Sequence, residues 1–276
     1  MTQSSADPER DRLLPGSFRA RGVEFAIRIL RRFCRETGYP ARARHMEWSL
    51  LLSVDDAPRA VSDRLLDLAE EAVGHARQVS TAQVAARMTE DFPVRFPSVW
   101  PGEHYKLLAG LVLALKPKLV VEIGTGEGLS SLTMVPHLPA DGRLVTFDLV
   151  HWADYPRTCL CANDFADGRL QQVLDDLSKD EAFARAEAIL RRADLVFMDG
   201  PKNWSFEENM VSRFSSMRFE SSPIFVFDDI RLWPMIRFWR DLTWPKLDLT
   251  SYGHWTGTGL AELGGRHIAS THATTS

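Results

Sequence analysis

Apolar residues change their spacing once along the chain. From Phe18 to about Asp91 they recur every three or four positions, which predicts a helical region with breaks at Pro40 and Pro58. The periodic positions include Val23, Ile27, Leu30, Phe33, Leu65, Leu68, Ala69 and Val73. The prolines at 93, 97 and 101 then interrupt any helix, so we place a domain boundary in this segment.

Beyond that boundary, short continuous apolar runs alternate with helical patterns. The runs cover residues 119–123, 144–147, 170–174, 195–198 and 224–227. Continuous apolar runs separated by room for a crossover helix are typical of strands buried on both faces of a parallel sheet. The segment from Lys246 to Leu260 has the glycine turns of a final hairpin. We therefore predict an α/β fold, a Rossmann-like, doubly wound and mostly parallel seven-stranded sheet with an N-terminal helical extension.

The predicted organisation has four parts. Residues 1–14 and 269–276 are polar and are expected to be disordered tails. Residues 15–95 form the helical region, either a lid over a substrate or a dimerisation surface. Residues 96–268 form the sheet domain, in which ligands are expected just beyond the carboxyl ends of the strands.

Composition narrows the expected partners and location. With 276 residues, 45% of them hydrophobic, and a formal net charge of −4, the chain has no overall field that would attract nucleic acid or an anionic membrane. It has no apolar stretch of about 18 residues and no basic, then apolar, leader. Its three cysteines fit free thiols, so we expect a cytoplasmic protein that acts on a small molecule.

A glycine-rich turn follows the first predicted strand. The segment from Glu122 to Ser130 has the spacing Glu-x-Gly-x-Gly-x-Gly and leads into a helical pattern. Such a turn lets the backbone approach a ligand, and the helix start offers free amides to an anion. A dinucleotide-binding loop would place its third glycine at Leu129. A purely structural tight turn is the alternative.

Acidic residues follow the second and third predicted strands. Asp148 stands twenty residues after Gly128, where a carboxylate can accept the hydroxyls of an adenosine ribose. This feature suits both NAD and S-adenosylmethionine (SAM). Asp175 and Asp176 end the third strand, and an acid there can contact an adenine amino group or cap the next helix.

The loop, Asp148 and the strand pattern resemble class I SAM-dependent methyltransferases over roughly residues 100 to 265. The resemblance implies SAM as cofactor and places Glu122 and the loop near the methionine moiety and Ser130 near its carboxylate. It places Asp148 on the ribose, Asp176 on the adenine side and Asp199 beside the cofactor. The loop residues concerned are Glu122, Gly124, Thr125, Gly126 and Gly128.

Three carboxylates are expected to converge at the ends of the fourth and fifth strands. Asp199 ends one strand, and Asp228 and Asp229 end the next. Like charges at one sheet edge either raise one pKa or require a cation, and an all-oxygen set suits Mg²⁺ or a similar divalent ion. Such an ion would lower the pKa of a substrate hydroxyl. Lys202, with its pKa lowered beside the ion, would then be the general base.

Asp199-x-x-Lys202 and the acidic pair also resemble metal-dependent O-methyltransferases of the catechol and caffeoyl-CoA type. The catechol type has Asp-Asn where this chain has Asp228-Asp229, a variant associated with sugar O-methyltransferases of antibiotic pathways. Gly200 and Pro201 replace bulkier residues beside the base. The alternative is that Asp199 contacts only the cofactor, Lys202 is a surface cation and the pair caps a helix.

Further residues admit more than one interpretation. His254 can be a second base, a substrate contact or a structural residue of the hairpin. Glu103 and His104 can reach the methionine end of the cofactor or merely cap a helix. Tryptophans after the reactive strand ends can wall a pocket or lie in the core. These tryptophans are Trp204, Trp233, Trp239, Trp244 and Trp255.

The leading hypothesis is SAM- and divalent-metal-dependent O-methylation of a small-molecule hydroxyl of the natural-product or sugar type. A metal-independent N- or C-methyltransferase on the same fold is the second hypothesis. An NAD-dependent oxidoreductase and a non-catalytic nucleotide-binding protein are the others. The acceptor is not encoded in any motif, and a homodimer is expected for a protein of this size.

Overall fold

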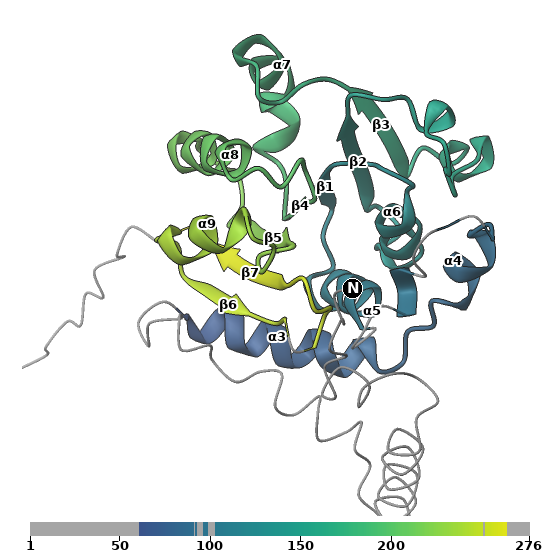
Figure 1. Cartoon of the computed structure of the whole chain (residues 1–276), viewed down its shortest axis with the longest axis horizontal. Helices are drawn as coiled ribbons and strands as arrows, with labels where there is room; N and C mark the ends of the chain where they lie inside the picture. The colour runs from purple at the N-terminus through teal and green to yellow at the C-terminus, as the bar shows by residue number, and fades with distance from the viewer. Residues whose placement is uncertain (1–60, 91, 93–95, 99–102, 251, 264–276) are drawn as a thin grey trace, which may run out of the picture. The chain divides into compact units, whose positions relative to one another are not determined.

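The computed structural model of the chain describes residues 61–90, 92, 96–98, 103–250 and 252–263 (Figure 1). All of them belong to one compact unit, Trp48–Ser276. The helix predicted around residues 23–33 and both predicted terminal tails lie outside the described residues.

A seven-stranded sheet forms the centre of this unit. Its order is β3-β2-β1-β4-β5-β7-β6, and β7 runs antiparallel to its neighbours β5 and β6 while the other pairs are parallel. The strands are β1 (Leu119–Ile123), β2 (Arg143–Asp148), β3 (Leu170–Leu174), β4 (Leu195–Met198), β5 (Ile224–Asp228), β6 (Lys246–Asp248) and β7 (Thr258–Glu262). The predicted fold is confirmed, and each of the five apolar runs forms a strand.

Helices cover both faces of the sheet (Figure 1). They are α3 (Asp63–Ala76), α4 (Ala82–Arg87), α5 (His104–Leu115), α6 (Leu129–Met134), α7 (Asp180–Leu190), α8 (Ser205–Ser216) and α9 (Met235–Asp241). Short 3₁₀ helices are η2 (Phe96–Ser98), η3 (Val135–His137), η4 (Trp152–Asp154) and η5 (Ala162–Phe165). Because side chains alternate along a strand, Val121 of β1 belongs to the same buried cluster as Leu190 of α7 and Phe214 of α8, whereas Glu122 faces α6.

The helix α3 confirms the second part of the predicted helical region. Ser62 caps it by accepting a hydrogen bond from the Leu65 amide at 3.2 Å. Its buried residues face α5, and a Cβ on Gly110 of α5 would lie 2.2 Å from the carbonyl oxygen of Ala72, so only glycine permits this approach. Whether residues 15–95 form a separate region stays a prediction. Among the described residues, no helix has the length and apolar character needed to cross a membrane.

The strand order reverses next to β1, since β2 and β3 lie on one side of it and β4 and β5 on the other. In open α/β sheets such a switch point opens a crevice at the carboxyl ends of the strands. The loops after β1, β2, β4 and β5 all meet at this edge. The residues singled out by the sequence therefore come together here.

Candidate active site

The loop after β1 depends on glycine at each turn. Gly124, Gly126 and Gly128 all have positive φ, at 105°, 49° and 82°. A Cβ on Gly124 would lie 2.2 Å from the carbonyl oxygen of Asp199. Gly124 therefore allows the loop after β1 to lie directly against the end of β4.

Asp148 fastens this loop to the end of β2. One carboxylate oxygen accepts hydrogen bonds from the amides of Thr125 at 2.8 Å and Gly126 at 3.1 Å. The other oxygen accepts from the amides of Leu149 at 2.7 Å and Val150 at 3.0 Å. The carboxylate thus orders the loop. Its expected contact with a ribose stays a prediction, and it would compete with these four amides.

Glu122 lies below the loop and is fully buried. Its carboxylate accepts hydrogen bonds from Ser130 at 2.5 Å and from Ser131. Burial raises its pKa to about 7, although the hydroxyls of Ser130, Ser131 and Thr146 oppose this shift. Two large cavities lie at this edge of the sheet, and Glu122 lines neither of them, so the geometry gives Glu122 a role in holding the loop. Its assignment to the methionine moiety stays a prediction.

The larger of the two cavities measures about 770 Å³. It lies between the glycine loop and the ends of β2, β3 and β4, and Gly124, Gly126, Asp148, Tyr155, Asp176 and Asn209 contribute to its wall. Asp176 also accepts hydrogen bonds from the amide of Ser178 at 3.0 Å and its hydroxyl at 2.6 Å, which lower the pKa of Asp176. Asp176 thus both caps a turn and faces the cavity.

The smaller cavity measures about 420 Å³ and lies on the other side of the loop. Its wall contains parts of the loop, the acidic residues after β4 and β5, the start of α5 and the hairpin. They are Thr125, Gly126, Gly128, Ser130, Asp199, Asp228, Asp229, His104, Tyr105, His254 and Trp255. Gly126 and Asp199 line both cavities, so the two spaces adjoin at these residues. The side chain of Thr125 contacts Thr146 at 2.8 Å.

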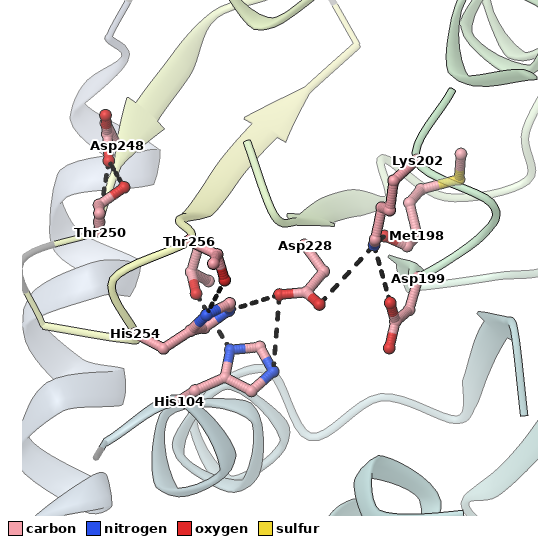
Figure 2. A network of polar contacts seen from close by, with 10 residues as sticks. His104, Met198, Asp199, Lys202, Asp228, Asp248, Thr250, His254 and Thr256 are labelled. Carbon is pink, nitrogen blue, oxygen red and sulfur yellow. Dashed lines mark hydrogen bonds and ion pairs between the residues drawn. The ribbon is translucent and has the colours of Figure 1, made fainter. Parts of the chain in front are cut away.

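A chain of ionisable side chains connects Lys202 with His104 through Asp228 and His254 (Figure 2). The Nζ of Lys202 lies 2.7 Å from Asp199 Oδ1 and 3.7 Å from Asp228 Oδ2. The other oxygen of Asp228, Oδ1, lies 2.6 Å from His254 Nε2 and 3.8 Å from His104 Nε2. Asp228 therefore has a lysine side and a histidine side.

The pKa values follow from burial and mutual charge. Burial raises the pKa of Asp199 well above its usual range, and Asp228 adds to the effect. Burial also raises the pKa of Asp229. The pKa of Asp228 is lowered because Lys202 and the two histidines outweigh its desolvation. Burial opposes the charge on Lys202, yet the carboxylates prevail and raise its pKa, opposite to the direction expected beside a divalent ion.

Backbone strain is concentrated in the loops that hold this cluster. Lys202, Trp204 and Asp229 have φ of 51°, 65° and 59°. Each such non-glycine conformation costs about 1–3 kcal/mol and persists where the surroundings enforce it. Their position after β4 and β5 is consistent with the prediction that these two loops form the functional site.

His254 has both ring nitrogens engaged. Nε2 contacts Asp228 and Nδ1 lies 2.5 Å from the Thr256 hydroxyl. To accept a proton from a substrate, His254 would have to give up one of these contacts. The prediction that it is a second base is therefore untested, and the geometry favours a positioning role.

His104, Thr256 and Thr258 take part in the cluster although no motif marked them as a group. The His104 ring stacks edge-on against that of His254 with centroids 4.4 Å apart, and its Nδ1 lies 3.0 Å from Thr258 Oγ1. Burial lowers the pKa of His104 to about 3, so this ring is neutral. Only the sheet topology, which brings β7 beside β5 at the start of α5, makes these residues neighbours.

Comparison with known proteins gives structural likeness alone. No protein-family model and no curated protein matches the chain. The SAH-bound methyltransferase PaMTH1 of Podospora anserina matches at 14% identity over 71% of this chain and 95% of its own, with a TM-score of 0.46. TomG of Streptomyces achromogenes is an O-methyltransferase of tomaymycin synthesis whose structure was solved with SAM. It matches at 20% identity over 79% of this chain and 94% of its own, with a TM-score of 0.41. An O-methyltransferase of Bacillus cereus bound to SAH matches at 17% identity over 71% of this chain and 90% of its own, also with a TM-score of 0.41.

Identities and TM-scores this low establish neither an activity nor a substrate for this chain. The fold assignment rests instead on the chain's own strand order and on the switch point beside β1. Within that fold, the two adjoining cavities and the charge cluster between β4 and β5 define the candidate site.

Proposed function

We propose that this protein is a SAM-dependent methyltransferase that methylates a hydroxyl group of a small molecule. The supporting observation is that two cavities adjoin at Gly126 and Asp199. One is bordered by a glycine loop and the ends of β2 and β3, as a nucleoside requires. The wall of the other contains Asp199 and Asp228, the two carboxylates that flank the ammonium of Lys202, and activation of a hydroxyl requires such a proton-accepting group.

The larger cavity fits an adenosine moiety in size and polarity. Its volume of about 770 Å³ is in the range of small-molecule sites. Asp148 and Asp176 place carboxylates at the ends of adjacent strands, where ribose and adenine donors can be accepted. When bound, SAM supplies an electrophilic methyl group, and the chain holds it beside Asp199.

Lys202 is the proposed proton acceptor on the other side of Asp199. Its ammonium is held at 2.7 Å by Asp199, and its raised pKa means that it must lose a proton before it can accept one from the substrate. Methylation should therefore accelerate as the pH rises. Asp228, on the far side of Lys202, fixes the position of Nζ.

The divalent cation expected from the sequence belongs to this proposal. Oxygens of Asp199, Asp228 and Asp229 lie within 4.8 Å of one another, and an all-carboxylate set suits Mg²⁺. Such an ion would supply a positive charge that lowers the pKa of the acceptor hydroxyl. It would also have to replace the Lys202 ammonium between Asp199 and Asp228, because that cation already lies there.

The acceptor is proposed to have an aromatic or sugar-bearing body of the natural-product type. Phe96, Tyr105 and Trp255 contribute to the wall of the smaller cavity, and Trp255 is 62% exposed at its edge. Aromatic walls of this kind bind planar and ring-shaped groups.

Calorimetric titration with S-adenosylhomocysteine, with NAD⁺ as the control ligand, tests the cofactor. Binding of S-adenosylhomocysteine without binding of NAD⁺ supports the proposal. Asp148→Ala should weaken the binding of S-adenosylhomocysteine, because Asp148 orders the loop and lines the larger cavity. Preference for NAD⁺, or no binding by folded protein, would contradict it. Turnover of an acceptor library with Mg²⁺ and then with excess chelator tests the metal requirement separately.

A further inference from the structure

The histidine side of Asp228 offers a different set of ligands from the carboxylate side. His104 comes from the start of α5, Asp228 from the end of β5 and His254 from the hairpin between β6 and β7. All three side chains are buried, each residue being 8% exposed, and their donor atoms lie within 4.8 Å of one another. We propose that His104, Asp228 and His254 bind a divalent transition-metal ion such as Zn²⁺, Mn²⁺ or Fe²⁺.

The donor distances are close to those that such an ion needs. Ligand atoms at about 2.0–2.2 Å from a tetrahedral metal lie roughly 3.3–3.6 Å from one another. Asp228 Oδ1 lies 2.6 Å from His254 Nε2 and 3.8 Å from His104 Nε2, values on either side of that range.

A second group of contacts orients both imidazoles toward the same point. Thr258 Oγ1 lies 3.0 Å from His104 Nδ1, and Thr256 Oγ1 lies 2.5 Å from His254 Nδ1. Metal-binding histidines usually donate their other ring proton to such a partner, which fixes the tautomer with the lone pair on the metal-binding nitrogen. Both Nε2 atoms therefore face Asp228, as Figure 2 shows.

The access of an ion to the three side chains and the donor atoms that they offer also support a transition-metal site. His104, Asp228 and His254 all line the smaller cavity, so an ion can reach them from solvent. Two nitrogens and one carboxylate oxygen favour a transition metal over Mg²⁺, which prefers oxygen alone. On this side an ion need not displace Lys202, because Lys202 contacts the opposite oxygen of Asp228.

The proposal does not depend on methyl transfer, since the test needs no substrate. Co²⁺ serves as the probe, because its visible absorption bands report the number and geometry of its ligands, and calorimetry gives its affinity for the full-length protein. We expect one strong site per chain. His104→Gln and His254→Gln should each abolish the absorption bands, and Thr258→Val should weaken binding by about 10–100-fold.

One variant distinguishes the two sides of Asp228, and a second serves as a control. Asp199→Asn changes only the carboxylate side, and Co²⁺ should still bind with the same absorption bands. His75→Ala, in which an imidazole on α3 is removed, is the matched control for surface histidines and should leave binding unaltered. Circular dichroism and melting curves establish that each variant is folded.

The proposal is overturned if folded wild-type protein binds no Co²⁺. It is equally overturned if binding survives both histidine substitutions, or if it is lost in Asp199→Asn while His104→Gln retains it. None of these results would affect the separate measurement of S-adenosylhomocysteine binding.

Discussion

The larger and smaller cavities adjoin at Gly126 and Asp199 but differ in what their walls contain. The larger cavity is bordered by backbone and by acids such as Asp148 and Asp176, whose carboxylates accept hydrogen bonds from nearby amides and a hydroxyl. The smaller cavity is bordered by ionisable groups, among them Asp199, Asp228 and Asp229, whose pKa values are shifted by desolvation and by neighbouring charges.

This difference separates binding from chemistry. Groups that are satisfied by backbone amides hold a rigid surface against which a ligand can be positioned. Groups that are buried together with opposing charges keep shifted pKa values, and such sites are suited to move protons. We therefore expect changes in the smaller cavity to alter turnover, and changes in the glycine loop to alter cofactor binding and stability.

The largest effect is expected for Lys202→Met. Loss of the proton acceptor should lower turnover by as much as about 10⁴-fold, with S-adenosylhomocysteine binding in the larger cavity retained. Because the pKa of Lys202 is raised, wild-type turnover should rise with pH and the variant should not. The measurement is a pH–rate profile, with Lys118→Met on the surface as control. Wild-type-like turnover would remove Lys202 from the mechanism.

Asp199→Asn should come next, with turnover lowered by about 10³-fold. The amide keeps the size of the side chain but cannot become the carboxylate that pairs with Lys202 at 2.7 Å. Because Asp199 lines both cavities, cofactor affinity should fall as well, though less than turnover. Steady-state kinetics and calorimetry measure the two effects. Asp180→Asn, an exposed partner of Arg213, is the control, and an equal loss of kcat/KM in both variants would show a general effect of removing an acid.

Glu122→Gln tests the support below the loop through stability. The folded-state pKa of Glu122 is raised to about 7, so between its unfolded pKa and pH 7 the native protein binds the extra proton. Wild-type stability should therefore decline as the pH rises through that window, by about 3 kcal/mol from this group, and stay level above it. The variant should lack this decline. Urea unfolding at about pH 5 and about pH 8 measures it; parallel pH profiles would contradict the shift.

The two cavities also differ in how much of them the sequence predicts. The loop after β1, Asp148 and Asp176 follow strands whose apolar runs are evident, so the edge on which they lie could be predicted from parallel topology alone. The convergence of Asp199 with Asp228 follows for the same reason.

The histidine side of the smaller cavity was not predictable in this way. His104 and His254 are 150 positions apart, and they meet because β7 inserts antiparallel beside β5. The direction of the Lys202 pKa shift was also beyond the sequence, since it depends on distances to three carboxylates. Likewise, the hydrogen bonds of Asp148 to four amides depend on the exact path of the loop.

Gly124→Ala should give the smallest of these effects and tests the point where the cavities meet. At φ of 105°, and with a new Cβ 2.2 Å from the Asp199 carbonyl, alanine should cost about 2 kcal/mol of folding free energy. The shift it forces on Asp199 should also weaken S-adenosylhomocysteine binding. Gly74→Ala, in α3 with no atom within 4 Å of the new Cβ, is the matched control and should stabilise by about 0.5–1 kcal/mol. Since both variants add one methyl group, equal melting temperatures would mean that the loop does not need its close approach to β4.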